Sequence, residues 1–195
     1  MMKVIFDYFF AIIGLFCLFP VLLFISILIK TTSKGPVLYT QKRVGRFGVL
    51  FKILKFRTMY SGHGDDNTVT VSGDDRITKI GYFLRKYKLD ELPELINILK
   101  GEMSLVGPRP DLPGYADKLK GDNRKILELK PGITSCASLK YANEEFLLAS
   151  QKDPIKYNNE VIYPDKVKIN LDYYNNNSFW IDIKIIFATI FRNTY

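Results

Sequence analysis

One stretch without any charged residue limits what this chain can fold into. It runs from Tyr8 to Ile29 and contains 22 residues. As a helix it would reach about 33 Å, which is enough to cross the hydrocarbon core of a bilayer. A cleaved signal peptide fits poorly, because the apolar run is long and LIKTTSKGP follows it in place of a small-residue cleavage site. We therefore expect residues 1–30 to form a retained segment that contacts lipid.

Pro20 lies near the middle of this apolar run. It removes one backbone donor and crowds the preceding turn, so we expect the helix to bend there. Two arrangements are open: a kinked helix that spans the membrane, and a re-entrant helix that leaves by the face it entered. Lys3 precedes the run, and Lys30 and Lys34 follow it. Positive charge prefers the cytoplasmic side, so basic residues at both ends favour the re-entrant arrangement, but the sequence leaves both open.

The rest of the chain suits one domain. The whole chain has 195 residues and a net charge of +8. Two cysteines make no disulfide framework, and the single His63 argues against a histidine-based triad or metal cage. Between Thr31 and Tyr60 there are seven basic residues and no acidic one. Beside a membrane helix, this basic segment suits anionic lipid headgroups or an anionic substrate.

Hydrophobic periodicity predicts an α+β fold, mostly helical with a short β-hairpin. The two strands are expected in VLYTQ and VLFKILKFRTM. A polar loop from Tyr60 to Asp75, a turn-rich connector over 101–114 and a turn at KPGITS separate helical patterns. These patterns cover residues 76–88, 90–100, 116–130, 143–152, 160–175 and 178–193.

The C-terminal helix 178–193 is amphipathic. Its polar residues Asp182, Thr189 and Arg192 lie opposite an apolar face made of Phe179, Ile183, Ile186, Phe187 and Ile190. Two interpretations are open. The helix packs into the core, or it lies at a membrane interface with Trp180 near the headgroups.

Asp90 and Glu91 begin the run DELPELINILKG. Its apolar residues share one helix face, Pro93 suits a first turn and Gly101 a termination, so the two carboxylates sit at a helix start. Acidic residues there can simply cap the helix. However, Arg85, Lys86 and Lys88 precede the pair, and helix N-termini beside cations bind phosphate. Carboxylates in this setting also suit Mg²⁺. The combination indicates chemistry on phosphate at a membrane surface.

The run KLDELPELINILKGEMSLVGPRP resembles the signature of the bacterial sugar transferase family, the small monotopic polyprenol-phosphate phosphoglycosyl transferases. The similarity continues, in the family's order, through GPVLYTQKRVGRFG, FKILKFRTM, DDRITKIGYFLRKYK, KPGITS and the tail LDYYNNNSFWIDIKIIFATI. It therefore covers nearly the whole chain. The most specific feature is Asp-Glu-Leu-Pro followed about a dozen residues later by Gly-Pro-Arg-Pro.

The resemblance implies an activity. Such enzymes move a phosphosugar from a UDP-sugar to undecaprenyl phosphate and release UMP, in the first membrane step of surface glycan assembly. By this resemblance Asp90 would be the nucleophile that forms an aspartyl-phosphosugar intermediate. Glu91 would assist it, and both would hold Mg²⁺. Substrate binding would fall to Lys55, Arg57, Arg85, Arg109 and Asp172, and Pro20 would bend the re-entrant helix.

The resemblance also implies an organisation. Residues 1–30 would be the re-entrant membrane helix, and residues 31–195 a catalytic domain on the cytoplasmic face of the bacterial inner membrane. The expected partners are a UDP-sugar, polyprenyl phosphate and this membrane, with a homodimer as a further candidate and no nucleic acid. The chain departs from the family pattern at three positions. Phe19 stands where members often have Ser, and Ser135 and Ala142 replace the usual continuation of the PGIT motif.

Two other functions remain open from the sequence. A non-enzymatic, membrane-anchored basic module would bind anionic lipid or nucleic acid, which the pI of about 9.3 permits. This function leaves Asp90 and Glu91 without a role, and the chain shows no recognisable nucleic-acid module. The other is a transferase in which the lipid phosphate attacks the donor directly, without a covalent intermediate.

Overall fold

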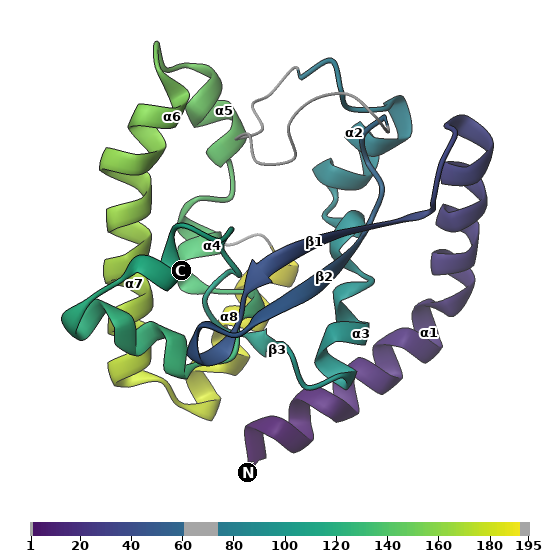
Figure 1. The fold of residues 1–195 in the computed structure, drawn as a ribbon. Coiled ribbons are helices and arrows are strands. Elements are labelled where there is room, and N and C mark those ends of the chain that lie inside the picture. The colour runs from purple at the N-terminus through teal and green to yellow at the C-terminus, as the bar shows by residue number, and fades with distance from the viewer. Residues whose placement is uncertain (1, 61–73, 192–195) are drawn as a thin grey trace.

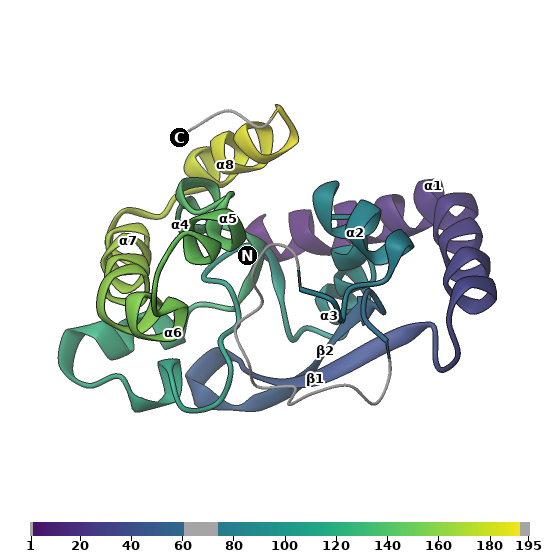
Figure 2. The same ribbon diagram turned by 90° about the horizontal axis from the view of Figure 1, so that it is seen from above.

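The first element of the fold is a long bent helix. The structure, a computed structural model, describes residues 2–60 and 74–191 (Figure 1). Helix α1 (Met2–Thr32) contains Pro20 and bends along its length in both views (Figures 1 and 2). Within the described ranges it is the one helix whose length and composition would allow it to cross a membrane. Its apolar side chains are mostly exposed or half-buried, and Ala11, Ile25 and Ile29 are the buried ones.

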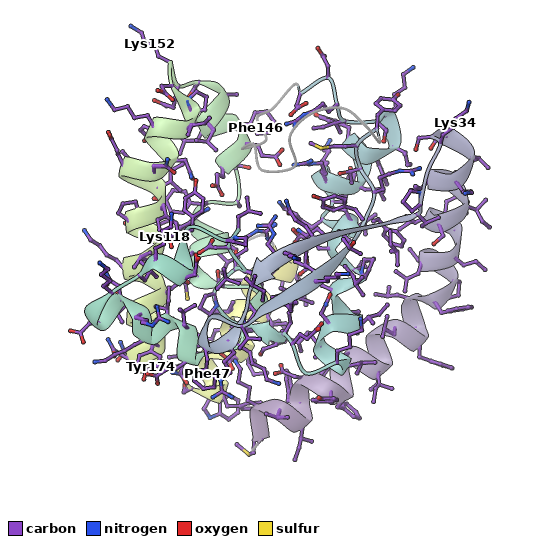
Figure 3. The ribbon with its side chains drawn as sticks, in the orientation of Figure 1. Lys34, Phe47, Lys118, Phe146, Lys152 and Tyr174 are labelled. Atoms are coloured by element: carbon purple, nitrogen blue, oxygen red, sulfur yellow. The ribbon has the colours of Figure 1, made fainter. Side chains whose placement is uncertain are left out.

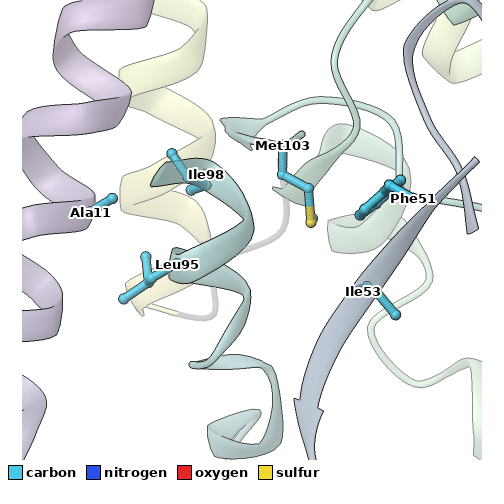
Figure 4. Packing of buried hydrophobic residues seen from close by; sticks show 6 residues of the cluster. All are labelled: Ala11, Phe51, Ile53, Leu95, Ile98 and Met103. Atoms are coloured by element: carbon cyan, nitrogen blue, oxygen red, sulfur yellow. The ribbon is translucent and has the colours of Figure 1, made fainter. Parts of the chain in front are cut away.

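Both halves of α1 pack against the rest of the protein. Ala11, in the first half, belongs to a buried cluster with Leu95 and Ile98 (Figure 4). Ile25 and Ile29, in the second half, pack in a separate cluster that contains Phe56 and Leu84. The outward side of the helix exposes large apolar residues, among them Phe9, Phe10, Phe16, Phe19 and Phe24.

The expected hairpin is present. Strands β1 (Leu38–Val44) and β2 (Leu50–Phe56) pair antiparallel, with Leu38 opposite Phe56 and Val44 opposite Leu50. A tight turn at Arg46–Gly48 joins them, and Gly48 adopts a φ of 81°, which suits glycine. Phe51 and Ile53 of β2 point into the core, as alternation along a strand requires.

Two short helices carry the chain from the hairpin to the middle of the core. Helix α2 (Lys79–Lys86) begins at Thr78, whose hydroxyl accepts a hydrogen bond from the Gly81 amide. A 3₁₀ turn, η2 (Leu89–Glu91), then leads into helix α3 (Glu94–Leu99). The sequence placed the acidic pair in the first turn of one helix, whereas the pair occupies this separate 3₁₀ turn. Figure 4 shows α3 lying between α1 and β2, with Met103 filling the space beside Phe51.

A second pairing was not expected from the sequence. Strands β3 (Ser104–Val106) and β4 (Gly132–Thr134) run parallel, inside the segments predicted as a connector and a turn. Strands of three residues show no usable periodicity, which explains why the sequence did not predict this pairing. Gly132 is required here, because a Cβ at this position would lie 2.1 Å from the Gly107 nitrogen.

The remaining chain is mostly helical. The charged helix expected over 116–130 is instead two 3₁₀ segments, η3 (Ala116–Lys118) and η4 (Gly121–Glu128). The predicted helices near 143–152 and 160–175 are confirmed with different boundaries. The elements that follow η4 and β4 are α4 (Cys136–Lys140), α5 (Glu144–Ala149), α6 (Pro154–Tyr157), a π-helical turn η5 (Asn158–Ile162), α7 (Tyr163–Asn176) and α8 (Phe179–Phe191). Helices α5, α6 and α7 lie on the opposite side of the hairpin from α1, whereas α8 lies behind the hairpin (Figure 1).

Helix α8 turns its polar side toward the protein. Asp182 and Ile185 are buried, whereas Trp180, Phe187 and Ile190 are exposed. The Thr189 hydroxyl lies 2.6 Å from that of Thr134 on β4. Most of the apolar face is therefore not in the core, which agrees with the interfacial interpretation. The predicted α+β class, mostly helical with one short hairpin, is confirmed. His63, Arg192 and most of the polar loop lie outside the described residues.

Candidate active site

The acidic pair predicted from the sequence sits at a sharp reversal of the chain between α2 and α3. Lys88, directly before η2, adopts a φ of 56°. A lysine in this left-handed region costs on the order of 1 kcal/mol, so the surrounding packing must hold it. The reversal leaves Glu91 buried and Asp90 half-buried beside it.

Glu91 is neutralised by two cations that come from distant parts of the chain. Its Oε1 accepts from Lys55 Nζ at 2.7 Å and from the Arg109 guanidinium. Burial alone would raise the pKa of this carboxyl, but Arg109 and Lys55 together hold it well below its usual range. Glu91 is therefore a fixed anion that orients two basic side chains.

Asn97 explains how Lys55 reaches this position. The amide is fully buried in α3. Its Oδ1 accepts from the Leu54 amide at 3.0 Å, and its Nδ2 donates to the Lys52 carbonyl at 2.8 Å. These two bonds fix β2 against α3 and bring Lys55 beside the acidic pair.

Arg109 is held by the short parallel pairing. The segment before it is anchored by hydrogen bonds from the Gly107 amide to Thr134 at 3.0 Å and from the Gly132 amide to Pro108 at 2.9 Å. The Arg109 side chain remains 42% exposed although it binds Glu91. Its guanidinium can therefore also meet an anion that arrives from solvent.

Asp90 differs from its neighbour because one oxygen has no partner. Its Oδ1 is buried and makes no hydrogen bond within the described part of the chain. Burial and the Glu91 charge raise the pKa of Asp90, while Lys55, Arg85 and Lys88 act in the opposite direction. An unpaired carboxylate oxygen among cations is available to a metal ion or to an electrophile.

Glu94 is a third carboxylate that the sequence analysis did not single out. It is 2% exposed, and its Oε1 lies 3.2 Å from Lys55 Nζ. Burial raises the pKa of Glu94 to about 7, with Lys55 opposing and Glu91 adding to the rise. Its spacing of three residues from Glu91 places both on one helical face, which is the signal that would have found it.

Three further residues proposed from the resemblance lie in different surroundings. Arg85 forms an ion pair at 2.6 Å with Glu145 of α5, which joins α2 to α5, and it still acts on the pKa of Asp90. Figure 3 shows Phe146 on the side of α5 that faces α2. Arg57 is buried and donates to the carbonyl and hydroxyl of Ser33, both at 2.8 Å, at the end of α1. Asp172 is exposed on α7, and its backbone carbonyl accepts a hydrogen bond from the Asn176 side-chain amide at 3.0 Å.

The structure thus gathers Lys55, Arg85 and Arg109 around Asp90 and Glu91. It does not bring Arg57 or Asp172 into direct contact with the acidic pair. Arg57 instead holds the chain where α1 ends. It directly follows β2, and its backbone amide donates to the Val37 carbonyl at 2.9 Å. For Asp172, the neighbouring Tyr173 takes the inward position on α7.

The acidic pair fits Mg²⁺ in part. Within residues 2–60 and 74–191, no group of three or more metal-ligating side chains comes together. Mg²⁺ does not need such a cage, because it is commonly bound by one or two carboxylates together with substrate phosphates and water. The free Oδ1 of Asp90 suits this role. Glu91 is already occupied by two cations, so its contribution to a metal is less direct.

Comparison with known proteins decides the family. The model of the bacterial sugar transferase family matches residues 1–194. The chain belongs to this family. A UDP-glucose:undecaprenyl-phosphate glucose-1-phosphate transferase of Klebsiella pneumoniae is 38% identical over 89% of the chain. A UDP-N-acetylgalactosamine-undecaprenyl-phosphate N-acetylgalactosaminephosphotransferase of Aeromonas hydrophila is 35% identical over 92%.

The chain spans less than half the length of these two relatives. The aligned part is 36% of the Klebsiella protein and 40% of the Aeromonas protein. A putative undecaprenyl-phosphate N-acetylgalactosaminyl 1-phosphate transferase of Bacillus subtilis is 42% identical over 62% of the chain and 68% of its own length. The named relatives use different sugars, so the similarity leaves the donor of this chain open.

Proposed function

We propose that this protein transfers a phosphosugar from a UDP-sugar to undecaprenyl phosphate and releases UMP. We further propose that the transfer passes through a phosphosugar bound to Asp90. The observation that carries this proposal is the contrast within the acidic pair. Lys55 and Arg109 both bind Oε1 of Glu91, whereas the Oδ1 of Asp90 is buried and makes no hydrogen bond within the described residues. A free carboxylate beside fixed cations is the arrangement that attack on a diphosphate requires.

In the first step, an oxygen of Asp90 would bond to the phosphorus that carries the sugar, and the bond from this phosphorus to the UMP oxygen would break. Bringing two anions to 4 Å costs about 4 kcal/mol per charge pair at an effective dielectric constant near 20. Arg109 and Lys55, held by Glu91, offset this repulsion, and Arg85 adds a third cation. These cations also stabilise the charge that UMP gains when it leaves.

In the second step, a phosphate oxygen of the polyprenyl phosphate would attack the same phosphorus and free Asp90. The attacking phosphate is already anionic, so it needs little help from a general base. Asp90 and the donor's phosphate oxygens would hold Mg²⁺, which neutralises phosphate charge when bound. Since the two steps are separate, the water-soluble donor and the lipid acceptor need not occupy the site together.

The contacts of α1 support a re-entrant helix rather than a spanning one. Near its start, Lys3 pairs with Asp182 of α8 at 2.6 Å, and Asp7 accepts from the Ser104 hydroxyl at 2.8 Å. At its other end, Ser33 is bound by Arg57. All of these partners belong to one folded domain, which lies on one side of any bilayer. We propose that α1 dips into the bacterial inner membrane with its exposed phenylalanines, and that the site faces the cytoplasm.

The charge of the chain also permits a non-enzymatic module that binds anionic lipid. This alternative gives no reason to bury a carboxylate without a partner, so the transferase is the function we favour. A homodimer remains a prediction that the contacts of one chain do not test.

The decisive experiment measures UMP release by the full chain in detergent, with a panel of UDP-sugars, Mg²⁺ and undecaprenyl phosphate. We expect release with at least one donor, and loss of release in Asp90→Asn. Asp122→Asn is the matched control, because it makes the same change in an exposed carboxylate of η4. Folded protein that releases UMP from no donor would overturn the proposed function.

Two further measurements test the finer parts of the proposal. Incubation with the donor but without lipid acceptor should add the mass of a phosphosugar to the wild type and not to Asp90→Asn. Turnover without such an adduct would favour direct attack by the lipid. For the topology, a cysteine at position 2 should resist labelling from the periplasmic side, and efficient labelling there would indicate a spanning helix.

A further inference from the structure

A further carboxylate, Asp111, lies close to the proposed site and has no part in the mechanism above. It follows Arg109 by two residues, after the Gly-Pro-Arg-Pro run. Its backbone carbonyl accepts from the Val44 amide at 2.9 Å, and the Arg43 guanidinium donates to the Pro110 carbonyl at 3.2 Å. The end of β1 therefore fixes the position of Asp111 relative to Arg109.

Three cations surround the Asp111 carboxylate, yet each is engaged with another group. The three are Lys166, Arg43 and Arg109. Lys166 binds Glu144 at 2.6 Å, Arg43 binds the Gln41 side chain at 2.6 Å, and Arg109 binds Glu91. Burial outweighs their attraction and raises the pKa of Asp111 to about 6. The carboxylate thus keeps the capacity to accept further hydrogen bonds.

Two buried donors, Tyr163 and Arg43, lie beside this acceptor. The Tyr163 hydroxyl is buried beside Asp111, and burial together with the Asp111 carboxylate raises the pKa of this phenol, so it stays a donor held close to the carboxylate. The Nε of Arg43 is buried without a partner in the part of the chain that the structure describes. The Tyr163 ring packs edge-on against Tyr115, with centroids 5.1 Å apart, which holds the phenol in place. Buried polar groups are normally satisfied, so the unpaired Nε of Arg43 leaves a donor for a ligand beside Asp111.

The chemistry of this group of side chains matches hydroxyl groups. A hydroxyl donates one hydrogen bond, which Asp111 can accept, and accepts others, which Arg43 and Tyr163 can donate. A UDP-sugar carries such hydroxyls on its hexose and on its ribose. Two extended residues span at most about 7 Å, so Asp111 lies within roughly one sugar ring of Arg109. The hexose is attached to the phosphorus that Asp90 would attack, whereas the ribose lies one phosphate further away.

We propose that Asp111, with Arg43 and Tyr163, binds hydroxyls of the donor hexose and determines which sugar is transferred. The inference rests on the proposed function and names the part of the site that reads the sugar. Arg43 lies in β1, where its guanidinium donates to the Pro110 carbonyl and the next residue's amide donates to the Asp111 carbonyl, so the subsite is tied to the same loop that places Arg109.

The test is a double-mutant cycle on UMP release by the full chain. One arm replaces Asp111 by Asn, and the other replaces the preferred UDP-hexose by analogues that each lack one hexose hydroxyl. For at least one analogue the wild type should lose tenfold or more in kcat/KM. Asp111→Asn should lose at least tenfold with the parent sugar and little more with that analogue. Inhibition by UMP should not change, and Asp122→Asn should behave as the wild type.

The outcomes separate the two proposals. If the wild type releases no UMP from any donor, the proposed function fails. If the wild type is active but Asp111→Asn discriminates against every hexose analogue as the wild type does, this inference fails alone. Coupling to a 2′-deoxyuridine donor instead of a hexose analogue also overturns it, because the subsite then reads the ribose. Tyr163→Phe provides the same cycle, with an expected loss of about fivefold, if thermal unfolding shows that Asp111→Asn does not fold.

Discussion

Two buried ionic networks in this protein use the same kinds of residues but differ in how completely their carboxylates are satisfied. The first, which we call the anchor network, connects α1 to α7 and α8. Lys3 donates to Asp182 at 2.6 Å and to the Tyr173 hydroxyl at 3.1 Å, and Tyr173 donates to the other Asp182 oxygen. Nearby, both oxygens of Asp7 accept hydrogen bonds, from Ser104 and from the Leu105 amide. No carboxylate oxygen of Asp7 or Asp182 lacks a donor.

The second network surrounds the acidic pair and is incomplete. Both cations that bind Glu91 contact the same oxygen, and the Oδ1 of Asp90 has no hydrogen bond within residues 2–60 and 74–191. Glu94 lies nearby and shares Lys55 with Glu91. A satisfied network stabilises the fold, whereas a buried carboxylate oxygen without a donor is costly and marks a candidate functional group. The comparison therefore predicts that the two networks respond differently to mutation.

The largest effect is expected at Asp90. Replacing it by Asn removes the proposed nucleophile and should lower the rate of UMP release by at least about a thousandfold, or about 4 kcal/mol of activation free energy. The free energy of unfolding should not fall, because no hydrogen bond of Oδ1 is lost. UMP release and thermal unfolding of the same preparation check both statements. A folded variant with an undiminished rate would show that the incomplete network is not catalytic.

The opposite pattern is expected in the anchor network. Asp182→Asn leaves the Lys3 charge without its partner, and breaking such a pair costs about 2–3 kcal/mol of the free energy of unfolding. Activity per folded molecule should be nearly unchanged. Chemical denaturation measures the first quantity, and UMP release at a temperature below unfolding measures the second. Loss of activity without loss of stability would contradict the division between the networks.

Glu94 should make stability depend on pH. Its pKa is raised from 4.5 to about 7, mainly by burial, while Lys55 and Arg109 oppose the rise. The unfolded chain therefore releases this proton first, and stability should fall as pH rises from about 4.5 to 7. The full shift corresponds to about 3 kcal/mol. Glu94→Gln should lack this contribution, so its stability relative to the wild type should increase between pH 5 and pH 8. A pH-independent difference in denaturation midpoint would contradict the assignment.

The smallest effect is expected for an ion pair outside both networks. Lys140 and Asp165 lie 2.6 Å apart on the surface between α4 and α7. Exposed pairs contribute between about 0 and 1 kcal/mol, so Lys140→Ala should change the denaturation midpoint little and the rate of UMP release not at all. A larger loss of stability would mean that burial is a poor guide to the strength of these pairs.

The sequence predicted those parts of the site that depend on local pattern. Alternation along the strands predicted the hairpin that carries Lys55, and helical spacing placed Asp90 and Glu91 near the start of α3. The basic residues before the pair included Arg85, and the resemblance to the bacterial sugar transferase family added Arg109; the structure brings both to the acidic pair.

The features that were missed depend on contacts between distant segments. Arg57 reads as one more basic residue of the strand, and only the position of Ser33 at the end of α1 shows what it binds. The β3–β4 pairing is too short for any periodicity, although it determines where Arg109 lies. On α8, Asp182 reads as solvent-facing in a helical projection, but Lys3 at the other end of the chain draws it inward. For Asp172, the resemblance gave a role that its exposed position does not explain.

Asn97 has a consequence for how the hairpin tolerates insertions. Its side-chain amide forms hydrogen bonds with the backbone of Lys52 and of Leu54, the two residues that flank Ile53 in β2. Extra residues in the Arg46–Gly48 turn would lengthen the tip and leave Lys55 where it is. One extra residue between Leu54 and Lys55 would turn the ammonium to the other face of the ribbon, because successive side chains of a strand alternate. Variation in length is therefore expected at the Arg46–Gly48 turn of the hairpin, and not next to the residues that Asn97 binds.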